Sequence, residues 1–323
     1  MTPSDQPPPD QLPHDGLPSG ELPPGQRPSG ATPPDPPSGT VAQGLLADFS
    51  LEMTGKDIPA LEAARGAIPA GTRINVTFLG NEDLPMRVAA STAVRAAGFV
   101  PVPHVSARRL ATEAELDGFL EALSTRAGAR DIFVVGGDPA QPMGPYPDSL
   151  SVIRSGALTR HGFTHASISG YPEGHPDIDA DTLWRALEDK AAALASQGLD
   201  GSIITQFGFD TEPVLDWLAE VRRRGIDLPV RIGVPGPAGI KRLLTFAKRF
   251  GIASSAGIAQ KYGFSLANLL GTAGPDRFLR DLAAGHDPAV HGAVGLHFYT
   301  FGGLKATADW IADFRDDDGG RRA

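Results

Sequence analysis

Polar side chains able to do chemistry recur in this sequence directly after short apolar runs. The most distinctive segment reads Tyr-Pro-Glu-Gly-His-Pro at residues 171–176 and cuts off the alternating run of residues 165–170. Two prolines and a glycine end a strand and leave a rigid loop that carries a phenol, a carboxylate and an imidazole. Such groups transfer protons or hold a cofactor. Taken alone, the segment is equally compatible with a structural turn.

Other apolar runs end in the same way. The polar residues at these ends are Glu52, Thr77, His104, Asp138, Gln206, Asp210, His297 and Tyr299. Singly, each also fits a structural role, such as a salt-bridge partner or a hydrogen-bonded core histidine. Together they are hard to explain by packing, because a buried polar group costs several kcal/mol unless it is satisfied. A ligand that completes the network is therefore expected.

The residue types narrow the chemistry. The chain has no cysteine, which excludes disulfides, thiolate nucleophiles and Cys-ligated metals. His104, His175 and His297 stand on separate runs without metal-ligand spacing, so no metal site is expected. There is no Gly-x-Ser-x-Gly segment and no Walker loop. Cofactor or proton chemistry by Glu, Asp, His, Tyr and Gln remains.

Apolar runs and amphipathic segments alternate along the chain. The expected strands cover residues 47–53, 74–79, 100–105, 131–137, 165–172, 202–209, 230–235 and 294–301. Helical spacing of apolar residues falls between them, with Asp181 and Thr211 expected to cap helix starts and Gly198, Gly225 and Gly251 expected at helix ends. Eight mostly apolar strands alternating with helices predict an α/β fold, a (β/α)8 TIM barrel. A doubly wound sheet is the rival, but residues 51–57 are not its Gly-rich phosphate loop.

Composition sets the domain organisation and excludes some partners. Residues 1–42 are rich in proline and glycine and poor in large apolar side chains, so we expect a disordered tail ahead of a single barrel domain at 43–318.

A net charge of -9 argues against nucleic acid as a partner. No apolar run approaches the roughly 20 residues that span a membrane, and a cytoplasmic location is the default. The outer helices offer surfaces for a homo-oligomer.

The motifs resemble the 5,10-methylenetetrahydrofolate reductases over roughly residues 45–315. The segments at 171–176 and 205–210 (Thr-Gln-Phe-Gly-Phe-Asp) are specific, whereas those at 50–52, 76–78, 103–104, 137–138 and 297–300 are weak alone. The resemblance implies a (β/α)8 barrel with FAD at the C-terminal ends of its strands. It also implies a reaction in which NAD(P)H reduces the flavin, which then passes a hydride to methylenetetrahydrofolate to give 5-methyltetrahydrofolate, in one-carbon metabolism and methionine supply.

The resemblance also implies roles for single residues. Glu52 stands at the position of the general acid that opens the five-membered folate ring, and Asp138 at that of the aspartate between flavin and pterin. Gln206 matches the glutamine that binds the pterin. Phe301 is expected to stack on a substrate ring, although core packing explains it equally well. The expected cofactor-binding residues are Thr77, His104, Gly137, Asp138, Tyr171, His175 and Lys190.

The chain departs from the family pattern mainly where the cofactor is expected. Gly136 replaces an arginine, Gly208 an aromatic residue and Ile240 a stacking phenylalanine, and helix 180–197 carries only Arg185 and Lys190 as basic residues. A divergent branch is indicated. Three alternatives are open for such a branch. The first is a protein that holds FAD in a different way, and the second is one that works without FAD, either by direct hydride transfer from the nicotinamide or as a non-catalytic folate binder. The third is an enzyme that runs mainly as a 5-methyltetrahydrofolate oxidase. A flavin-free aldolase or phosphate-ligand isomerase is less favoured, since no strand ends in lysine, although the glycine-rich loop 233–239 keeps it open.

Overall fold

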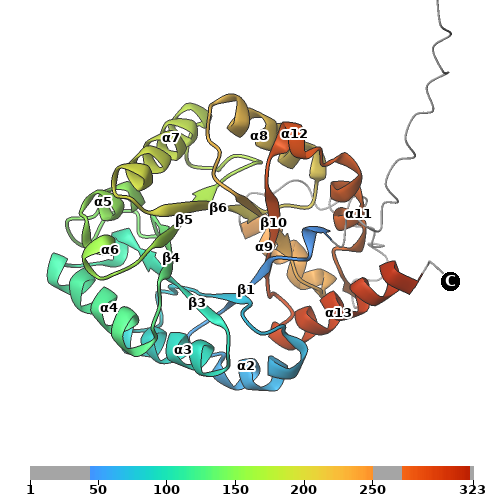
Figure 1. Ribbon diagram of the computed structural model, residues 1–323, viewed down its shortest axis with the longest axis horizontal. Coiled ribbons are helices and arrows are strands. Elements are labelled where there is room, and N and C mark those ends of the chain that lie inside the picture. The colour runs from blue at the N-terminus through green and yellow to red at the C-terminus, as the bar shows by residue number, and fades with distance from the viewer. Residues whose placement is uncertain (1–43, 250–270, 321–323) are drawn as a thin grey trace, which may run out of the picture. The chain divides into compact units, whose positions relative to one another are not determined.

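Eight parallel strands close into a barrel in the computed structural model, which describes residues 44–249 and 271–320 (Figure 1). Each strand pairs with its neighbours in the order β1-β10-β7-β6-β5-β4-β3-β2. The strands are β1 (Phe49–Met53), β2 (Arg73–Val76), β3 (Val100–Ser106), β4 (Asp131–Val135), β5 (His165–Gly170), β6 (Asp200–Phe207), β7 (Val230–Pro235) and β10 (Val294–Tyr299). The predicted (β/α)8 fold is confirmed. The predicted tail lies outside the described residues.

Helices surround the barrel and cover the outer face of its strands (Figure 1). They are α2 (Ile58–Ala64), α3 (Leu84–Ala96), α4 (Glu113–Arg126), α5 (Ser149–Arg154), α6 (Ala157–Arg160), α7 (Ala180–Ser196), α8 (Thr211–Arg223), α9 (Ile240–Arg249), α11 (Asp276–Gly285), α12 (Pro288–His291) and α13 (Leu304–Gly320). Two 3-10 turns, η1 (Arg65–Ala67) and η2 (Ala107–Arg109), extend loops. No helix within the described ranges is long and apolar enough to cross a membrane.

The apolar core lies mainly between the strands and the helices. Successive strand residues point to opposite faces, so Leu51 and Met53 of β1 pack outward while Ser50 and Glu52 face the barrel interior. Inside the barrel, a small apolar cluster of Val102, Phe133 and Ile204 separates polar groups above and below it. The interior therefore has room for chemistry at its C-terminal end.

Helix starts and one small sheet differ from the sequence prediction. The side chain of Asp179, not Asp181, accepts the capping hydrogen bond of α7, from Thr182 N at 2.9 Å. Asp210, not Thr211, caps α8. The cap must precede the helix so that its oxygen reaches the free N–H groups of the first turn. The short antiparallel pair β8 (Ala238–Gly239) and β9 (Thr272–Ala273) was not predicted.

The helix ends follow the prediction more closely. Gly198 and Gly225 have φ of 67° and 74° just after α7 and α8, as expected of glycine beyond a helix end. Gly251 lies outside the described residues.

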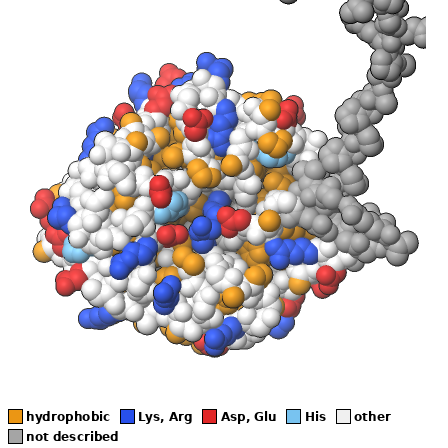
Figure 2. Space-filling view, viewed as in Figure 1, with side chains coloured by type: hydrophobic (Ala, Val, Ile, Leu, Met, Phe, Trp, Pro, Cys, Tyr) orange, Lys and Arg blue, Asp and Glu red, His pale blue; other side chains and the backbone are white. Residues whose placement is uncertain are grey.

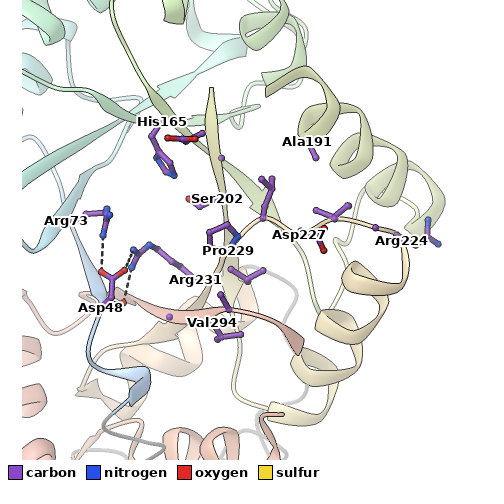
Figure 3. A pocket seen from close by; sticks show the side chains of 18 of the residues that line it. Asp48, Arg73, His165, Ala191, Ser202, Arg224, Asp227, Pro229, Arg231 and Val294 are labelled. Atoms are coloured by element: carbon purple, nitrogen blue, oxygen red, sulfur yellow. Dashed lines mark hydrogen bonds and ion pairs between the residues drawn. The ribbon is translucent and has the colours of Figure 1, made fainter. Parts of the chain in front are cut away.

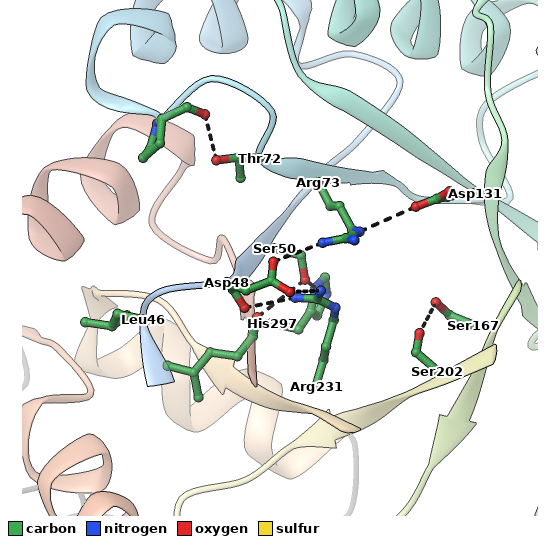
Figure 4. A network of polar contacts seen from close by, with 12 residues as sticks. Leu46, Asp48, Ser50, Thr72, Arg73, Asp131, Ser167, Ser202, Arg231 and His297 are labelled. Carbon is green, nitrogen blue, oxygen red and sulfur yellow. Dashed lines mark hydrogen bonds and ion pairs between the residues drawn. The ribbon is translucent and has the colours of Figure 1, made fainter. Parts of the chain in front are cut away.

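A charged network closes the N-terminal end of the barrel. Asp48 lies between two arginines, with Oδ1 2.9 Å from Arg73 Nη1 and Oδ2 2.6 Å from Arg231 Nη2 (Figures 3 and 4). Arg73 also faces Asp131 at 3.4 Å. A cavity of about 930 Å³ lies beside this network, and Figure 2 shows acidic, basic and histidine side chains gathered around a central hollow. These groups link the starts of strands and stand apart from the polar C-terminal ends.

Candidate active site

The C-terminal ends of the strands surround a cavity of about 660 Å³. Glu52, Thr77, Gln206 and Phe301, which the sequence singled out, all line it. The remaining lining residues are Met53, Thr54, Asp57, Ala60, Leu79, Phe207, Arg242, Phe246, Tyr299, Thr300, Gly302, Gly303 and Leu304. The cavity has the size and the mixture of aromatic walls and few polar groups that are typical of a small-molecule site.

Glu52 lies close to a buried histidine on the neighbouring strand. Ser50 of β1 lies beside His297 of β10, and the Ser50 hydroxyl is 2.9 Å from His297 Nδ1. His297 Nε2 is 3.6 Å from Glu52 Oε2, and the imidazole has no exposed surface. The Glu52 side chain keeps 19% of its surface exposed. At 3.6 Å the two groups form no hydrogen bond, and His297 Nε2 is buried without a hydrogen-bond partner among the described residues. The imidazole therefore borders the carboxylate that lines the cavity.

Aromatic rings form one wall of the cavity. Phe246 of α9 stacks on Phe301, with ring centroids 4.1 Å apart and an interplanar angle of 11°. Phe207 meets the edge of Phe301 at 5.0 Å. Burial, followed by the nearby charge of Glu52, raises the pKa of Tyr299 well above its usual value. Its phenol therefore stays protonated, and it donates to the carbonyl of Thr205 at 3.1 Å.

The strand β6 is irregular beside Gln206, which lines the cavity. The pairing of β6 with β7 shifts register between Ile204 and Phe207. Gly233 N donates to Thr205 Oγ1 at 2.8 Å, and a Cβ at Gly233 would stand only 2.4 Å from Thr205 O. This glycine lets the two strands approach closely, and the half-buried Gln206 follows Ser202 and Ile204 on the strand face that points into the barrel.

Unpaired polar atoms lie at the ends of β2 and β3. Among the described residues, Thr77 Oγ1, His104 Nε2 and Ser106 Oγ are buried without a hydrogen-bond partner. Burial lowers the pKa of His104 to about 4, so its imidazole is neutral near neutral pH. The ring packs edge-on against Phe133 at 4.7 Å. Buried polar groups rarely go unsatisfied, so these atoms are suited to a ligand.

Gly137 and Asp138 follow β4 on the same side of the barrel. Gly137 has φ of 95°, and a Cβ there would lie 2.1 Å from Ser106 Oγ, so only glycine fits. Asp138 does not line the cavity: its side chain is 72% exposed and its Oδ1 accepts from Arg109 Nη2 at 2.6 Å and from Nε at 2.9 Å. The structure thus places this carboxylate in an ion pair at the outer rim.

Apart from Thr77, none of the predicted cofactor residues lines this cavity, His104 and Gly137 included. Tyr171 lines a separate cavity of about 140 Å³ together with Trp184 and Trp217. His175 packs edge-on against Tyr171 at 5.5 Å, and its Nδ1 accepts from Asp177 N.

Lys190 is 7% exposed in α7, the helix that packs against α5. Burial lowers its pKa to about 8 despite the nearby charge of Asp148. Its ammonium group is therefore placed poorly for an external phosphate.

Several lining or supporting residues escaped the sequence analysis. Ser50 stands two residues before Glu52, so the strand period alone places both on one face. Arg242 and Phe246 are four residues apart in α9 and share a helix face. The sequence predicted no role for these two residues, because the resemblance to the family points only to Ile240 in this segment.

Known proteins resemble the chain mainly in its middle. Residues 69–262, more than half of the chain, match the family model of methylenetetrahydrofolate reductase. Methylenetetrahydrofolate reductase 1 of Schizosaccharomyces pombe is 28% identical over 141 residues, which are 41% of this chain and 22% of that protein. Methylenetetrahydrofolate reductase (NADH) 1 of Arabidopsis thaliana is 26% identical over 156 residues, 45% of this chain and 26% of that protein. The matches span only about a quarter of the length of these relatives.

Solved structures are more distant. The dihydropteroate synthase of Thermus thermophilus aligns with 83% of this chain and 93% of its own, at 15% identity and a TM-score of 0.44. That of Burkholderia cenocepacia aligns with 84% and 92%, at 14% identity and a TM-score of 0.45. Neither likeness is close enough to bear on function.

Proposed function

The chain belongs to the methylenetetrahydrofolate reductase family, and we propose that it interconverts 5,10-methylene- and 5-methyltetrahydrofolate with a bound flavin and NAD(P)H. The observation that carries this proposal is the Glu52 carboxyl in the cavity, 3.6 Å from the buried imidazole of His297. Opening the five-membered ring of the folate substrate breaks one of the two bonds from nitrogen to the bridging methylene carbon, and the nitrogen that leaves must take up a proton. A carboxyl group held in a partly closed site can supply that proton.

The cavity lining supports a reduced pterin as the substrate. The Gln206 side chain offers both a donor and an acceptor, which matches the alternating edge of a pterin ring. Phe207 and Phe301 provide flat apolar surfaces for its rings. Tyr299 stays protonated and therefore adds no negative charge beside Glu52.

Unpaired polar atoms near the ends of β2 and β3 support a flavin as the cofactor. Thr77 Oγ1, His104 Nε2 and Ser106 Oγ are buried and unpaired within the described chain. The flavin ring carries carbonyl and nitrogen acceptors and one N–H donor along an edge. Of the three residues only Thr77 lines the cavity, so it is the one that would hold that edge there. When bound, the flavin supplies hydride transfer, and the protein supplies orientation and protons.

The residues fit the pyrophosphate half of FAD less well. Arg109 is paired with Asp138, Lys190 is buried, and Arg185 is exposed and donates to Thr182 Oγ1. These observations favour a second candidate, a folate-binding barrel that works without FAD, by direct nicotinamide transfer or as a binder. A third form of the proposal is an enzyme that mainly oxidises 5-methyltetrahydrofolate. It would use the same residues for the reaction in the opposite direction.

The visible absorption spectrum separates these candidates. The purified protein is measured before and after FAD is added, and then after anaerobic addition of 5-methyltetrahydrofolate. We expect a flavin spectrum that bleaches with the folate. If no flavin binds at high FAD, the flavin part of the proposal fails and the FAD-free candidate takes its place.

Replacing the proposed acid tests the mechanism. Glu52→Gln removes the proton but keeps the shape, so we expect folate turnover to fall by at least about a hundredfold, the usual contribution of a general acid. Flavin reduction by NAD(P)H, followed by stopped-flow absorbance, should change little. Equal loss in both half-reactions would contradict the acid role. The comparison variant Gln206→Glu should weaken folate binding more than flavin binding.

A further inference from the structure

Arg242 is a cation at the active-site cavity without an ion-pair partner among the described residues, and we propose that it binds the glutamate carboxylates of the folate substrate. The inference rests on the proposed function. It gives a binding residue for the glutamate tail, the part of the substrate that lies farthest from the reacting ring. It adds a substrate-binding residue that the sequence motifs do not contain.

The position of Arg242 follows from the packing of α9. Arg242 and Phe246 are four residues apart, so they lie on the same helix face, and both line the cavity. Phe246 is fixed by its stacking on Phe301 at 4.1 Å. This contact turns the helix face toward the cavity, while the Arg242 side chain stays exposed. The guanidinium is therefore at the solvent side of the site.

The one positive charge of the lining is not paired with a carboxylate among the described residues. Glu52, Asp57 and Arg242 are the ionisable lining residues apart from Tyr299. Asp57 is already engaged, because its Oδ2 accepts from both Thr54 N and Thr54 Oγ1 at 2.8 Å. Arg242 has no ion pair with any residue in the described ranges, whereas Arg109 and Arg231 each pair with an aspartate. Within the described part of the chain it is thus the one positive charge in this lining, and it is available to a ligand.

The parts of a folate molecule match the groups of the cavity: Glu52 and Gln206, then the aromatic wall, then Arg242 at the solvent side. A folate consists of a pterin, a flat aminobenzoyl ring and one or more glutamates. The pterin requires Glu52 and Gln206, and the aromatic wall suits the aminobenzoyl ring. The carboxylates must then lie toward solvent, where a guanidinium binds them through two parallel hydrogen bonds. A pyrophosphate of NAD(P)H carries related charges, so the test includes that source.

The experiment compares Arg242→Gln with Lys241→Gln, a matched loss of charge at the exposed neighbouring residue that does not line the cavity. Dissociation constants are measured by calorimetry for 5-methyltetrahydrofolate and for a reduced pterin that lacks the aminobenzoyl-glutamate tail. We expect Arg242→Gln to weaken folate binding about tenfold, the value of one charge-assisted contact. Binding of the tail-free pterin should be unchanged, and Arg242→Lys should restore part of the folate affinity.

The outcomes distinguish this inference from the proposed function. If the wild-type protein binds folate and Arg242→Gln binds it equally well, the inference is wrong and the proposed function stands. Equal losses in Arg242→Gln and Lys241→Gln, or a loss confined to NAD(P)H, would also overturn it. If the wild-type protein binds neither folate nor the tail-free pterin, the proposed function fails, and the inference fails with it.

Discussion

Burial inside the barrel determines the charge of His104. Its pKa falls from 6.5 to about 4, chiefly because the charged form loses water. The unfolded chain then binds more protons than the folded chain between about pH 6.5 and 4. By linkage, the folded state loses stability as the pH falls through that window, by roughly 3 kcal/mol in total.

Replacing this histidine should remove its share of the acid sensitivity. His104→Gln cannot take up the proton, so we expect its free energy of unfolding to change less between pH 7 and pH 4 than that of the wild type. Urea unfolding followed by circular dichroism at each pH measures the difference. Burial also lowers the pKa of His165 and His291, but both remain in the variant and cancel in the comparison. Parallel stability curves would contradict the prediction.

Single residues show where sequence reasoning reaches and where it stops. The strand period and the ends of apolar runs predicted that Glu52, Thr77 and Gln206 converge, and they line one cavity. They did not predict the outward position of Asp138, because Arg109 reaches it from the loop of a different strand. An ion pair between two loops depends on the tertiary structure, which the local sequence pattern does not predict.

At the scale of elements, the hydrogen bond between β6 and β7 holds the irregular strand segment that carries Gln206. Thr205 is fully buried, and its hydroxyl accepts from Gly233 N at 2.8 Å. Thr205→Val keeps the shape but leaves that N–H without an acceptor, a cost of about 1–3 kcal/mol. We expect lower stability by urea unfolding and a higher KM for folate, by about tenfold, because the relaxed strand segment no longer holds Gln206 in place.

A threonine elsewhere provides the control for this prediction. Thr125→Val in α4 removes a hydrogen bond of similar length, from Thr125 Oγ1 to Glu121 O at 2.7 Å, on an exposed outer helix. Its KM should equal that of the wild type. An unchanged KM in Thr205→Val would mean that this hydrogen bond does not hold Gln206 in place.

The strands were more predictable than their surroundings. Each expected strand overlaps an observed one, because long apolar runs buried on both faces leave few alternatives. Several ends were predicted too far along: β2 stops at Val76 rather than at residue 79, because the apolar pattern continues through Phe78 and Leu79 although these residues belong to the loop. The β8–β9 pair was missed because two-residue strands have no detectable period.

At the scale of the whole barrel, stability and chemistry lie at opposite ends. The C-terminal end holds the proposed active site, and Asp48, Arg73, Asp131 and Arg231 tie together the starts of strands at the other end (Figure 4). Arg231 keeps only 12% of its side chain exposed, so its charge is screened little by solvent. Residues at this end should therefore affect folding and leave turnover unchanged, as in other barrels of this type.

Asp48→Asn tests this separation directly. The variant loses the carboxylate shared by Arg73 and Arg231 and leaves a mostly buried guanidinium without its partner, so we expect the free energy of unfolding to fall by about 1–3 kcal/mol. The control Asp309→Asn breaks an exposed pair with Lys305 in α13 and should cost less than about 0.5 kcal/mol. Urea unfolding at low and high salt measures both, while kcat and KM for folate should stay at the wild-type values. A loss of activity in Asp48→Asn at a temperature where it is fully folded would mean that the two ends of the barrel are coupled, and equal stability losses in the two variants would mean that the network adds nothing beyond a surface ion pair.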